Sequence, residues 1–408
     1  MKWNVWAERG FLAEYREELK YDFLCTCYLR FLKINFLRYT QPSYSLFLLA
    51  KESTLERASN HQQNKYIKEG LTEFYLTLPD SLTLPISKAQ FLQLAEYSKS
   101  YLLERLKKII RDIIMKIQYL NGGLANQIFQ YIFVRHAQLS CQCPEEWFFD
   151  DSFFFLNQVH NGYELEHIFH LAPNLLSQYF DSDIWNQLIE EKRNGGSIPQ
   201  SFKNLGFDII MITEFENYRE HNPFEGQIYR IPGNTFVPEI IKADNEFVYY
   251  HGYWQHPDWF RSYQSLLKKE LSFPPIADGR NCFYANQILN SKSVAVHIRR
   301  GDYAEFGWAS NVDYYLQKIK EILIHHPDAA FYVFSDDIPW CKQNCDALGL
   351  GLSQNVTYVE GNTQGRNYID LQLMSMCRIM IINRSAFGYL AMLLNDRLEH
   401  FFFDESER

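Results

Sequence analysis

Apolar residues between Leu102 and Ile114 recur with the spacing of one helix face. Leucine and isoleucine occupy positions i, i+1, i+4, i+7, i+8, i+11 and i+12 counted from Leu102, which is the pattern of an amphipathic helix. Lysines and an arginine stand between them, and such a basic helix suits either an acidic membrane surface or a neighbouring domain. Because the helix runs directly into an apolar strand segment, we favour packing on a domain. Residues 1–115 are therefore predicted to form a helical N-terminal extension.

The pattern changes after Lys116, where short apolar runs alternate with helical stretches. A strand is expected at 117–120, followed by a glycine turn and a helix. Strands that alternate with helices favour parallel, doubly wound sheets, and the ligands of such sheets bind at the carboxyl ends of the strands. Polar residues that directly follow a strand are therefore the candidate functional residues. The further strands are expected at 247–253, 293–298, 331–335 and 379–382, and further helices at 313–325 and 338–348.

Length and composition describe a globular protein of more than one unit. The chain has 408 residues, which is more than one ordinary domain and predicts two or three packed units. We divide it into 1–115, 116–285 and 286–408. Hydrophobic residues make up 47% and charged residues 22%, a balance that excludes disorder as a description of the whole chain. The net charge of −9 gives no general attraction to nucleic acid.

Neither a leading apolar segment nor a run approaching the ~20 apolar residues of a membrane span is found in the sequence. Eight cysteines in a chain of this length do not make a disulfide scaffold. Their close pairs lack the spacing of a zinc or redox site. We therefore expect a cytoplasmic protein, soluble or peripheral at the inner membrane, with reduced thiols and no bound metal. The pairs are Cys25/Cys27, Cys141/Cys143 and Cys341/Cys345.

The sharpest chemical signal follows the strand at 293–298, where the chain reads His-Ile-Arg-Arg-Gly-Asp from His297. Arg299 and Arg300 at a strand's carboxyl end suit a dianionic ligand, because a guanidinium matches phosphate oxygens and stays charged. If the leaving group is a nucleoside diphosphate, this charge performs the electrostatic work of a metal ion. Asp302 can orient one guanidinium. The alternative interpretation is a surface salt-bridge cluster.

A glycine turn at Gly122 and Gly123 opens the helix that carries Asn126 and Gln127. Free backbone N–H groups at such a helix start can face an anionic ligand, and the two amides can bind sugar hydroxyls. The spacing matches neither a P-loop nor a dinucleotide fingerprint. The alternative is an ordinary tight turn before a capped helix.

Two further strand ends carry polar residues. Ser335 and Asp336, followed by Asp337, fit ligand contact and helix capping equally well. Asp370 precedes the strand at 379–382, and Ser385 follows it. A carboxylate can accept hydrogen bonds from both N1–H and N2–H of guanine, which adenine cannot offer, and a serine at a helix start can bind phosphate.

Taken together, these motifs resemble the α-1,2-fucosyltransferases of bacterial glycosyltransferase family 11. That family carries Gly-Gly-Leu-Gly-Asn-Gln-x-Phe-Gln-Tyr, His-x-Arg-Arg-x-Asp-Tyr, Phe-Ser-Asp-Asp before Trp, and an Asp…Met-Ser-x-Cys…Asn-Ser-Ser-Phe-Ser-Trp-Trp tail. The corresponding segments here are 122–131, 297–303, 334–340 and 370–390. Segments 150–152 and 163–165 also match the family's spacing. The resemblance covers about residues 116–403.

The resemblance implies a GT-B-like α/β fold with two Rossmann-type halves, the C-terminal half holding GDP-fucose. It implies an inverting, metal-independent transfer of L-fucose from GDP-β-L-fucose to the 2-hydroxyl of a terminal galactose, in a surface glycan such as the lipopolysaccharide O-antigen. Donor and galactose-terminated oligosaccharide are then the partners, with no separate cofactor. We assign catalysis to His297, Arg299, Arg300, Asp302 and Asn126, with His297 and Asp302 as candidates for the base. Donor binding is assigned to Gly122, Gly123, Gln127, Ser335, Asp336, Asp370 and Ser385.

The tail departs from the family pattern. Ser-Phe-Ser-Trp-Trp becomes Ala-Phe-Gly-Tyr-Leu at 386–390, Arg384 stands where the family has asparagine, and Ala125 replaces a glycine. These changes remove the serine hydroxyls and two indoles but leave the arginine pair intact. A nucleotide-sugar or glycan-binding protein without catalysis, and a fucosyltransferase of another linkage, are therefore the rival interpretations.

Overall fold

The computed structural model describes residues 115–404, apart from 142–146, 158–160, 217–222 and the single residues 244, 246, 308, 310 and 364. The predicted extension, the basic helix at 102–114, Cys25, Cys27 and Cys143 lie outside the described residues. At Asp302 the backbone is described and the side chain is not.

The first sheet has the strand order β2-β1-β5-β3-β4. β1 pairs in parallel with β2 and β5, and β3 pairs in parallel with β4. β1, β2, β3 and β5 are almost entirely buried, and most of their residues are apolar or aromatic. β4 is an exposed edge strand. The bounds are β1 Met115–Tyr119, β2 Trp147–Asp150, β3 Ile209–Thr213, β4 Gln227–Arg230 and β5 Phe247–His251.

The second sheet has the order β10-β9-β6-β7-β8, and all its pairs are parallel. The strands expected at 293–298, 331–335 and 379–382 are confirmed here as β6, β7 and β9. β8 and β10 are short edge strands that the sequence analysis did not identify. The bounds are β6 Ser293–Ile298, β7 Ala330–Ser335, β8 Val356–Tyr358, β9 Ile379–Ile382 and β10 His400–Phe403.

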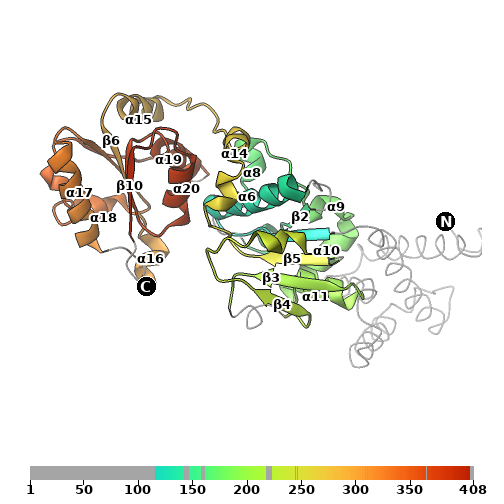
Figure 1. The fold of residues 1–408 in the computed structure, drawn as a ribbon. Helices are drawn as coiled ribbons and strands as arrows, with labels where there is room; N and C mark the ends of the chain where they lie inside the picture. The colour runs from blue at the N-terminus through green and yellow to red at the C-terminus, as the bar shows by residue number, and fades with distance from the viewer. Residues whose placement is uncertain are drawn as a thin grey trace, which may run out of the picture. The chain divides into compact units, whose positions relative to one another are not determined.

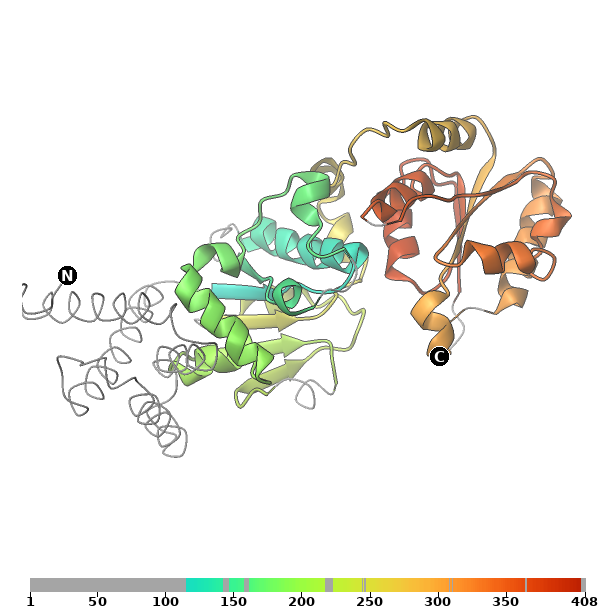
Figure 2. The same cartoon turned by 180° about the vertical axis from the view of Figure 1, so that it is seen from behind.

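Helices cover both sheets. α17 and α18 lie on one side of the second sheet, and α19 and α20 lie on the other, as Figure 1 and the opposite view in Figure 2 show. The helix expected at 338–348 ends early, at Gln343. The first half contains α6 Leu124–Cys141, α7 Phe153–Leu156, α8 Leu165–Phe169, α9 Leu176–Tyr179, α10 Ser182–Arg193, α11 Ile198–Asn204, η2 Pro238–Lys242, α13 Asp258–Arg261 and α14 Gln264–Glu270. The second contains α15 Gly279–Leu289, α16 Gly301–Glu305, α17 Val312–His325, α18 Ile338–Gln343, η3 Leu350–Leu352, α19 Asn367–Met374 and α20 Ala386–Leu394.

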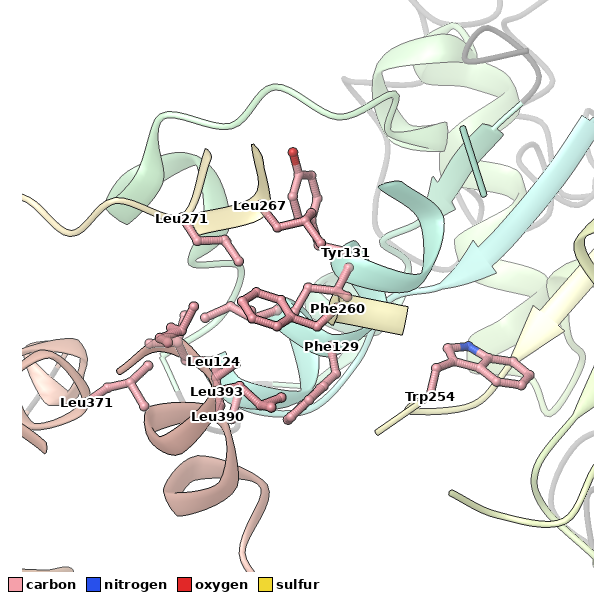
Figure 3. Close-up of a cluster of buried hydrophobic side chains, with 14 of the residues drawn as sticks. Leu124, Phe129, Tyr131, Trp254, Phe260, Leu267, Leu271, Leu371, Leu390 and Leu393 are labelled. Carbon is pink, nitrogen blue, oxygen red and sulfur yellow. The ribbon is translucent and has the colours of Figure 1, made fainter. Parts of the chain in front are cut away.

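Alternating side chains of β6 pack into two separate hydrophobic cores. Val294, Val296 and Ile298 join the cluster under α17 and α18. Ala295, from the other face, joins a larger cluster that includes α6, α19 and α20. Figure 3 shows this cluster, with Leu124 and Phe129 of α6 near Leu390 and Leu393 of α20. Successive side chains of a strand point to opposite faces of its sheet. One face of β6 therefore packs in the same core as α6, the helix that follows β1.

Residues 186–209, which include α11, group apart from the two sheets in a separate compact unit. There Ser197 caps α11 by accepting a hydrogen bond from the Gln200 N–H at 3.3 Å. The predicted boundary at 285/286 falls within α15, and the proposed domain limits stay a prediction. Among the described residues, no helix is both long and apolar enough to cross a membrane.

Candidate active site

A cavity of about 1710 Å³ lies at the carboxyl ends of strands from both sheets. The residues after β1, β3 and β5 line it from the first sheet, and those after β6, β7 and β9 line it from the second. This is the place that parallel sheets offer to a ligand. The predicted site residues that line it are Gly122, Gly123, Asn126, His297, Arg299, Ser335, Asp336, Asp370 and Ser385.

Of the two neighbouring arginines, Arg299 is the one that lines the cavity. Its Nη1 lies 2.8 Å from Asp336 Oδ2, and about a third of its side chain is exposed. The other oxygen of Asp336 accepts the Arg300 backbone N–H at 2.8 Å. A Cβ at position 301 would lie 2.6 Å from Asp336 Oδ2, so Gly301 permits this approach. Asp336 thus anchors the guanidinium, the task that the sequence analysis gave to Asp302.

Arg300 is placed differently. Its guanidinium carbon lies 3.7 Å from the centroid of the Trp340 ring, and its Nε lies 3.7 Å from Asp337 Oδ2. Arg300 is not among the residues that line the cavity. The expectation that both arginines face one ligand is therefore not met, because the second guanidinium stacks on an indole instead.

His297 is buried beside Arg299. Its Nδ1 lies 3.1 Å from Asn383 Oδ1, and its ring stacks on Phe387 with centroids 5.8 Å apart. Burial, and then the charge of Arg299, lower the pKa of His297 to about 4. The imidazole is therefore neutral near pH 7 and a weak base. Because Asn383 Oδ1 can only accept, Nδ1 carries the hydrogen and Nε2 is the acceptor.

The glycine turn at 122–123 also lies at the cavity. Gly122 has φ +79, and a Cβ there would lie 2.7 Å from Asn126 Nδ2, so this position requires glycine. Asn126 Oδ1 accepts from Gln255 at 3.2 Å.

Gln127 does not reach the cavity. Its amide nitrogen donates to the carbonyls of Gly122 and Gly162 at 3.0 and 2.8 Å, and its oxygen accepts the Glu164 N–H at 2.9 Å. Gln127 is fully buried. Its predicted sugar contact is therefore corrected, because its side chain secures backbone groups in the interior.

Asp370 lines the cavity from α19. Asn362 donates to its Oδ1 at 2.6 Å, and Asn362 is held in turn by Asn281, with N···O distances of 2.8 and 3.0 Å. Burial raises the pKa of Asp370 to about 7, although the bond from Asn362 opposes the rise. A ligand that donates hydrogen bonds to this carboxylate would favour its charged form.

Ser335, Asp337 and Ser385 all accept backbone hydrogen bonds near helix starts, but only the two serines line the cavity. Asp337 caps α18 by accepting the Trp340 N–H at 3.1 Å, and Ser335 Oγ accepts the Asp337 N–H at 3.0 Å. Ser385 caps α20 by accepting the Phe387 N–H at 3.3 Å. Capping is therefore the structural role of Asp337, whereas Ser335 and Ser385 also line the cavity.

Sequence analysis missed the residues that the first sheet contributes through β3 and β5. Glu214 and Phe215 directly follow β3, and Tyr253 follows β5. The short apolar run at 209–213 was the available signal. The acidic pair Asp150 and Asp151 lies outside the cavity lining, bonded to Tyr249 at 2.6 Å and Ser177 at 2.5 Å respectively. Within the part of the chain that the structure describes, no three His, Cys, Asp or Glu side chains are grouped to hold a metal ion.

Comparison with known proteins gives consistent similarities. The model of "Glycosyl transferase family 11" matches residues 205–399. An alpha-1,2-colitosyltransferase of Escherichia coli is 27% identical over 278 residues, which is 66% of this chain and 84% of that protein. Galactoside alpha-(1,2)-fucosyltransferase 1 of Homo sapiens is 30% identical over 107 residues, which is 25% of this chain and 28% of that protein. The crystal structure of POFUT1 in complex with GDP-fucose aligns with a TM-score of 0.40 and 13% identity, over 72% of this chain and 99% of that chain.

Proposed function

Because the model of glycosyltransferase family 11 matches residues 205–399 and a bacterial relative is similar over most of its length, we propose that the chain transfers L-fucose from GDP-β-L-fucose, with inversion, to the 2-hydroxyl of a terminal galactose. A surface glycan such as the lipopolysaccharide O-antigen is the proposed acceptor. One observation carries the proposal. A single cavity contains an anchored guanidinium at Arg299, a helix start at Ser385 and a partly buried carboxylate at Asp370. These groups complement a diphosphate and a guanine base.

Arg299 and the start of α20 account for the diphosphate. The guanidinium supplies a permanent positive charge, and α20 begins at the cavity with Ser385, where the positive end of the helix dipole favours an anion. Together they stabilise the negative charge that develops as the bond from sugar C1 to the β-phosphate breaks. In this proposal no divalent cation is needed.

Asp370 accounts for the base. Its carboxylate accepts N1–H and N2–H of guanine, and Asn362 keeps it oriented. Adenine offers no such pair of donors, so the proposal includes a preference for guanine nucleotides.

The sugar of the donor is the finer question, since one relative transfers colitose by its name. Colitose is fucose without the 3-hydroxyl. A pocket that hydrogen-bonds this hydroxyl discriminates strongly against the sugar that lacks it, whereas an apolar pocket discriminates weakly. The rates of transfer from GDP-fucose and from GDP-colitose therefore have to be compared in the same assay.

The test is incubation of the full chain with each donor and with lactose or lacto-N-biose, followed by NMR of the product. We expect an α-1,2 linkage from GDP-fucose. A chain that binds GDP but transfers neither sugar would support the binding-protein interpretation, and transfer to another hydroxyl would support the rival linkage. Either result contradicts the proposal.

A further inference from the structure

Glu214 enters the cavity from the first sheet, at the end of a strand that carries none of the residues assigned so far. It directly follows β3, whose residues are all buried. The Glu214 backbone N–H donates to the His251 carbonyl at 3.2 Å, which fixes the chain where the side chain leaves the sheet. Its side chain is among those that line the cavity.

Three backbone N–H groups hold the Glu214 carboxylate. Those of Tyr253 and Trp254 donate to Oε2 at 2.7 and 2.9 Å, and that of Asn234 donates to Oε1 at 3.1 Å. Each carboxylate oxygen accepts two hydrogen bonds, so Oε1 has room for one more donor from the cavity. Burial nevertheless raises the pKa of Glu214, which brings the carboxyl closer to the working range of a base.

The backbone around Glu214 is shaped for this carboxylate. A Cβ at Gly252 would lie 2.7 Å from Glu214 Oε2, so only glycine permits the approach. Trp254 has a left-handed φ of 55, and its buried indole donates to Gln118 at 2.8 Å. A non-glycine residue in this conformation is uncommon, and here it directs an N–H at the carboxylate.

The other carboxylates and imidazoles that line the described cavity are less suited to act as a base, because each has another partner or a low pKa. Asp336 is paired with Arg299, and Asp370 is bonded to Asn362 on the nucleotide side. His297 has a pKa near 4. His256 Nδ1 accepts the Asp258 N–H at 3.3 Å, so a neutral ring carries its hydrogen on Nε2 and donates. Glu360 is paired with Lys342 at 2.9 Å.

Aromatic rings flank Glu214 at the same cavity wall. Phe215 meets Tyr253 edge-to-face with centroids 5.5 Å apart, and Phe153 also lines the cavity. Aromatic faces provide the apolar surface on which the C–H face of a sugar ring packs. A carboxylate and aromatic rings that line the same cavity suit a neutral sugar that presents hydroxyl groups.

We propose that Glu214, Phe215 and Tyr253 form the acceptor-sugar subsite and that Glu214 is the catalytic base; this rests on the proposed function. The Glu214 carboxylate takes the proton of the acceptor hydroxyl as its oxygen forms the bond to fucose C1. The bond from C1 to the β-phosphate oxygen breaks, and its electron pair leaves with GDP. The proton then passes from Glu214 to solvent.

The test compares Glu214→Gln with Glu216→Gln. Glu216 lies on the same loop, is exposed and does not line the cavity, so the control makes the same chemical change nearby. For Glu214→Gln we expect kcat of transfer to fall at least ~100-fold, the usual contribution of a general base. GDP affinity and the slow hydrolysis of GDP-fucose without acceptor should stay unchanged, because neither needs an activated acceptor. Glu216→Gln should match the wild type in all three measurements.

A second variant covers the case in which Glu214→Gln does not fold. Gly252→Ala displaces the carboxylate without removing it and should lower transfer while sparing hydrolysis. Equal losses of transfer and hydrolysis in the folded variants would show a merely structural role and overturn the proposal. A selective loss of transfer in Asp302→Asn with none in Glu214→Gln would also overturn it.

Different results would contradict the role of Glu214 and the proposed transferase activity. If the wild type transfers fucose and both Glu214→Gln and Gly252→Ala transfer equally well, only the assignment of Glu214 is wrong. If the wild type binds GDP and transfers to no acceptor, the proposed function is wrong, and the role of Glu214 as base fails with it.

Discussion

At the scale of single residues, two neighbouring arginines with the same chemistry have different surroundings. Arg299 faces the cavity and is anchored by Asp336 at 2.8 Å, whereas Arg300 stacks on Trp340 at 3.7 Å. The sequence indicates that a strand end presents both. Only the side-chain packing after β7 determines which one reaches a ligand.

This difference predicts unequal effects of lysine substitution. Arg299→Lys should lower kcat/KM by ~100-fold, because an ammonium cannot form the two-pronged contact with phosphate while keeping Asp336. Arg300→Lys should lower it by no more than about tenfold and mainly reduce stability, since it loses a stacking interaction of about 1–2 kcal/mol. Initial rates and thermal melting of both variants check this. The reverse order of activity losses would contradict the placement of the two guanidinium groups.

Asp370 predicts how donor binding depends on pH. Its pKa is about 7 in the free protein, and the two hydrogen bonds proposed from guanine would stabilise the charged form, so binding should lower the pKa of Asp370. Affinity should therefore be highest above pH 7 and fall by about tenfold per unit below it, until the pKa of the complex is reached. Calorimetric titration with GDP-fucose between about pH 5.5 and 8 measures this, because its esterified diphosphate has no ionisation near 6.

Asp370→Asn is the matched variant for that titration. It should bind GDP-fucose more weakly at pH 8 by a factor of ~10–100, since a hydrogen bond to a charged group is worth about 1.5–3 kcal/mol. Its affinity should also vary little with pH. A variant that keeps the pH dependence of the wild type would assign the titration to another group.

At the scale of elements, α20 shows how a local departure from a family pattern fits its surroundings. Gly388 stands where the family has serine, and a Cβ there would lie 2.8 Å from His297 Nδ1 and 3.2 Å from Ile382. The buried imidazole and the helix therefore pack closer than a serine permits. The changed tail is thus accommodated by the structure around His297.

Restoring the family residue should consequently destabilise this chain. Gly388→Ser should cost about 1–3 kcal/mol, the usual penalty of overpacking, and should reduce transfer by displacing His297. Ala386→Ser, which restores the other serine at the start of α20, should leave the melting temperature almost unchanged. Thermal unfolding of the two variants decides the matter, and a Gly388→Ser protein as stable as the wild type would show that His297 has room to move.

The elements that sequence alone could predict are those with long apolar runs and marked ends. β6, β7 and β9 each have at least four consecutive buried residues, followed by Arg, Ser-Asp or Asn residues that signal a strand end. β3 has the same character but was not identified. Because β3 was not predicted, Glu214 and Phe215, which follow it and line the cavity, were not recognised as candidate site residues. The stacking of Arg300 and the interior role of Gln127 depend on partners distant in sequence, which no local pattern reveals.

At the scale of the whole molecule, the net charge is −9, yet two arginines and the start of a helix line the same cavity. Arg299 and Arg384 line it together with the start of α20. The large cluster that joins α6 to α19 and α20 includes a stacked pair of rings, Phe129 and Tyr389, with centroids 5.9 Å apart. Both sheets therefore contribute to one core as well as to one cavity, and the proposed acceptor and donor groups follow this division.

The central claim is that Arg299 neutralises the departing diphosphate without a divalent cation. The most direct measurement is the initial rate of transfer from GDP-fucose by the wild type and by Arg299→Lys, each in excess EDTA and in Mg²⁺. We predict a wild-type rate that is the same within about twofold in both conditions, and an Arg299→Lys rate that is low in both. A wild-type rate abolished by EDTA and restored by Mg²⁺ would contradict the account.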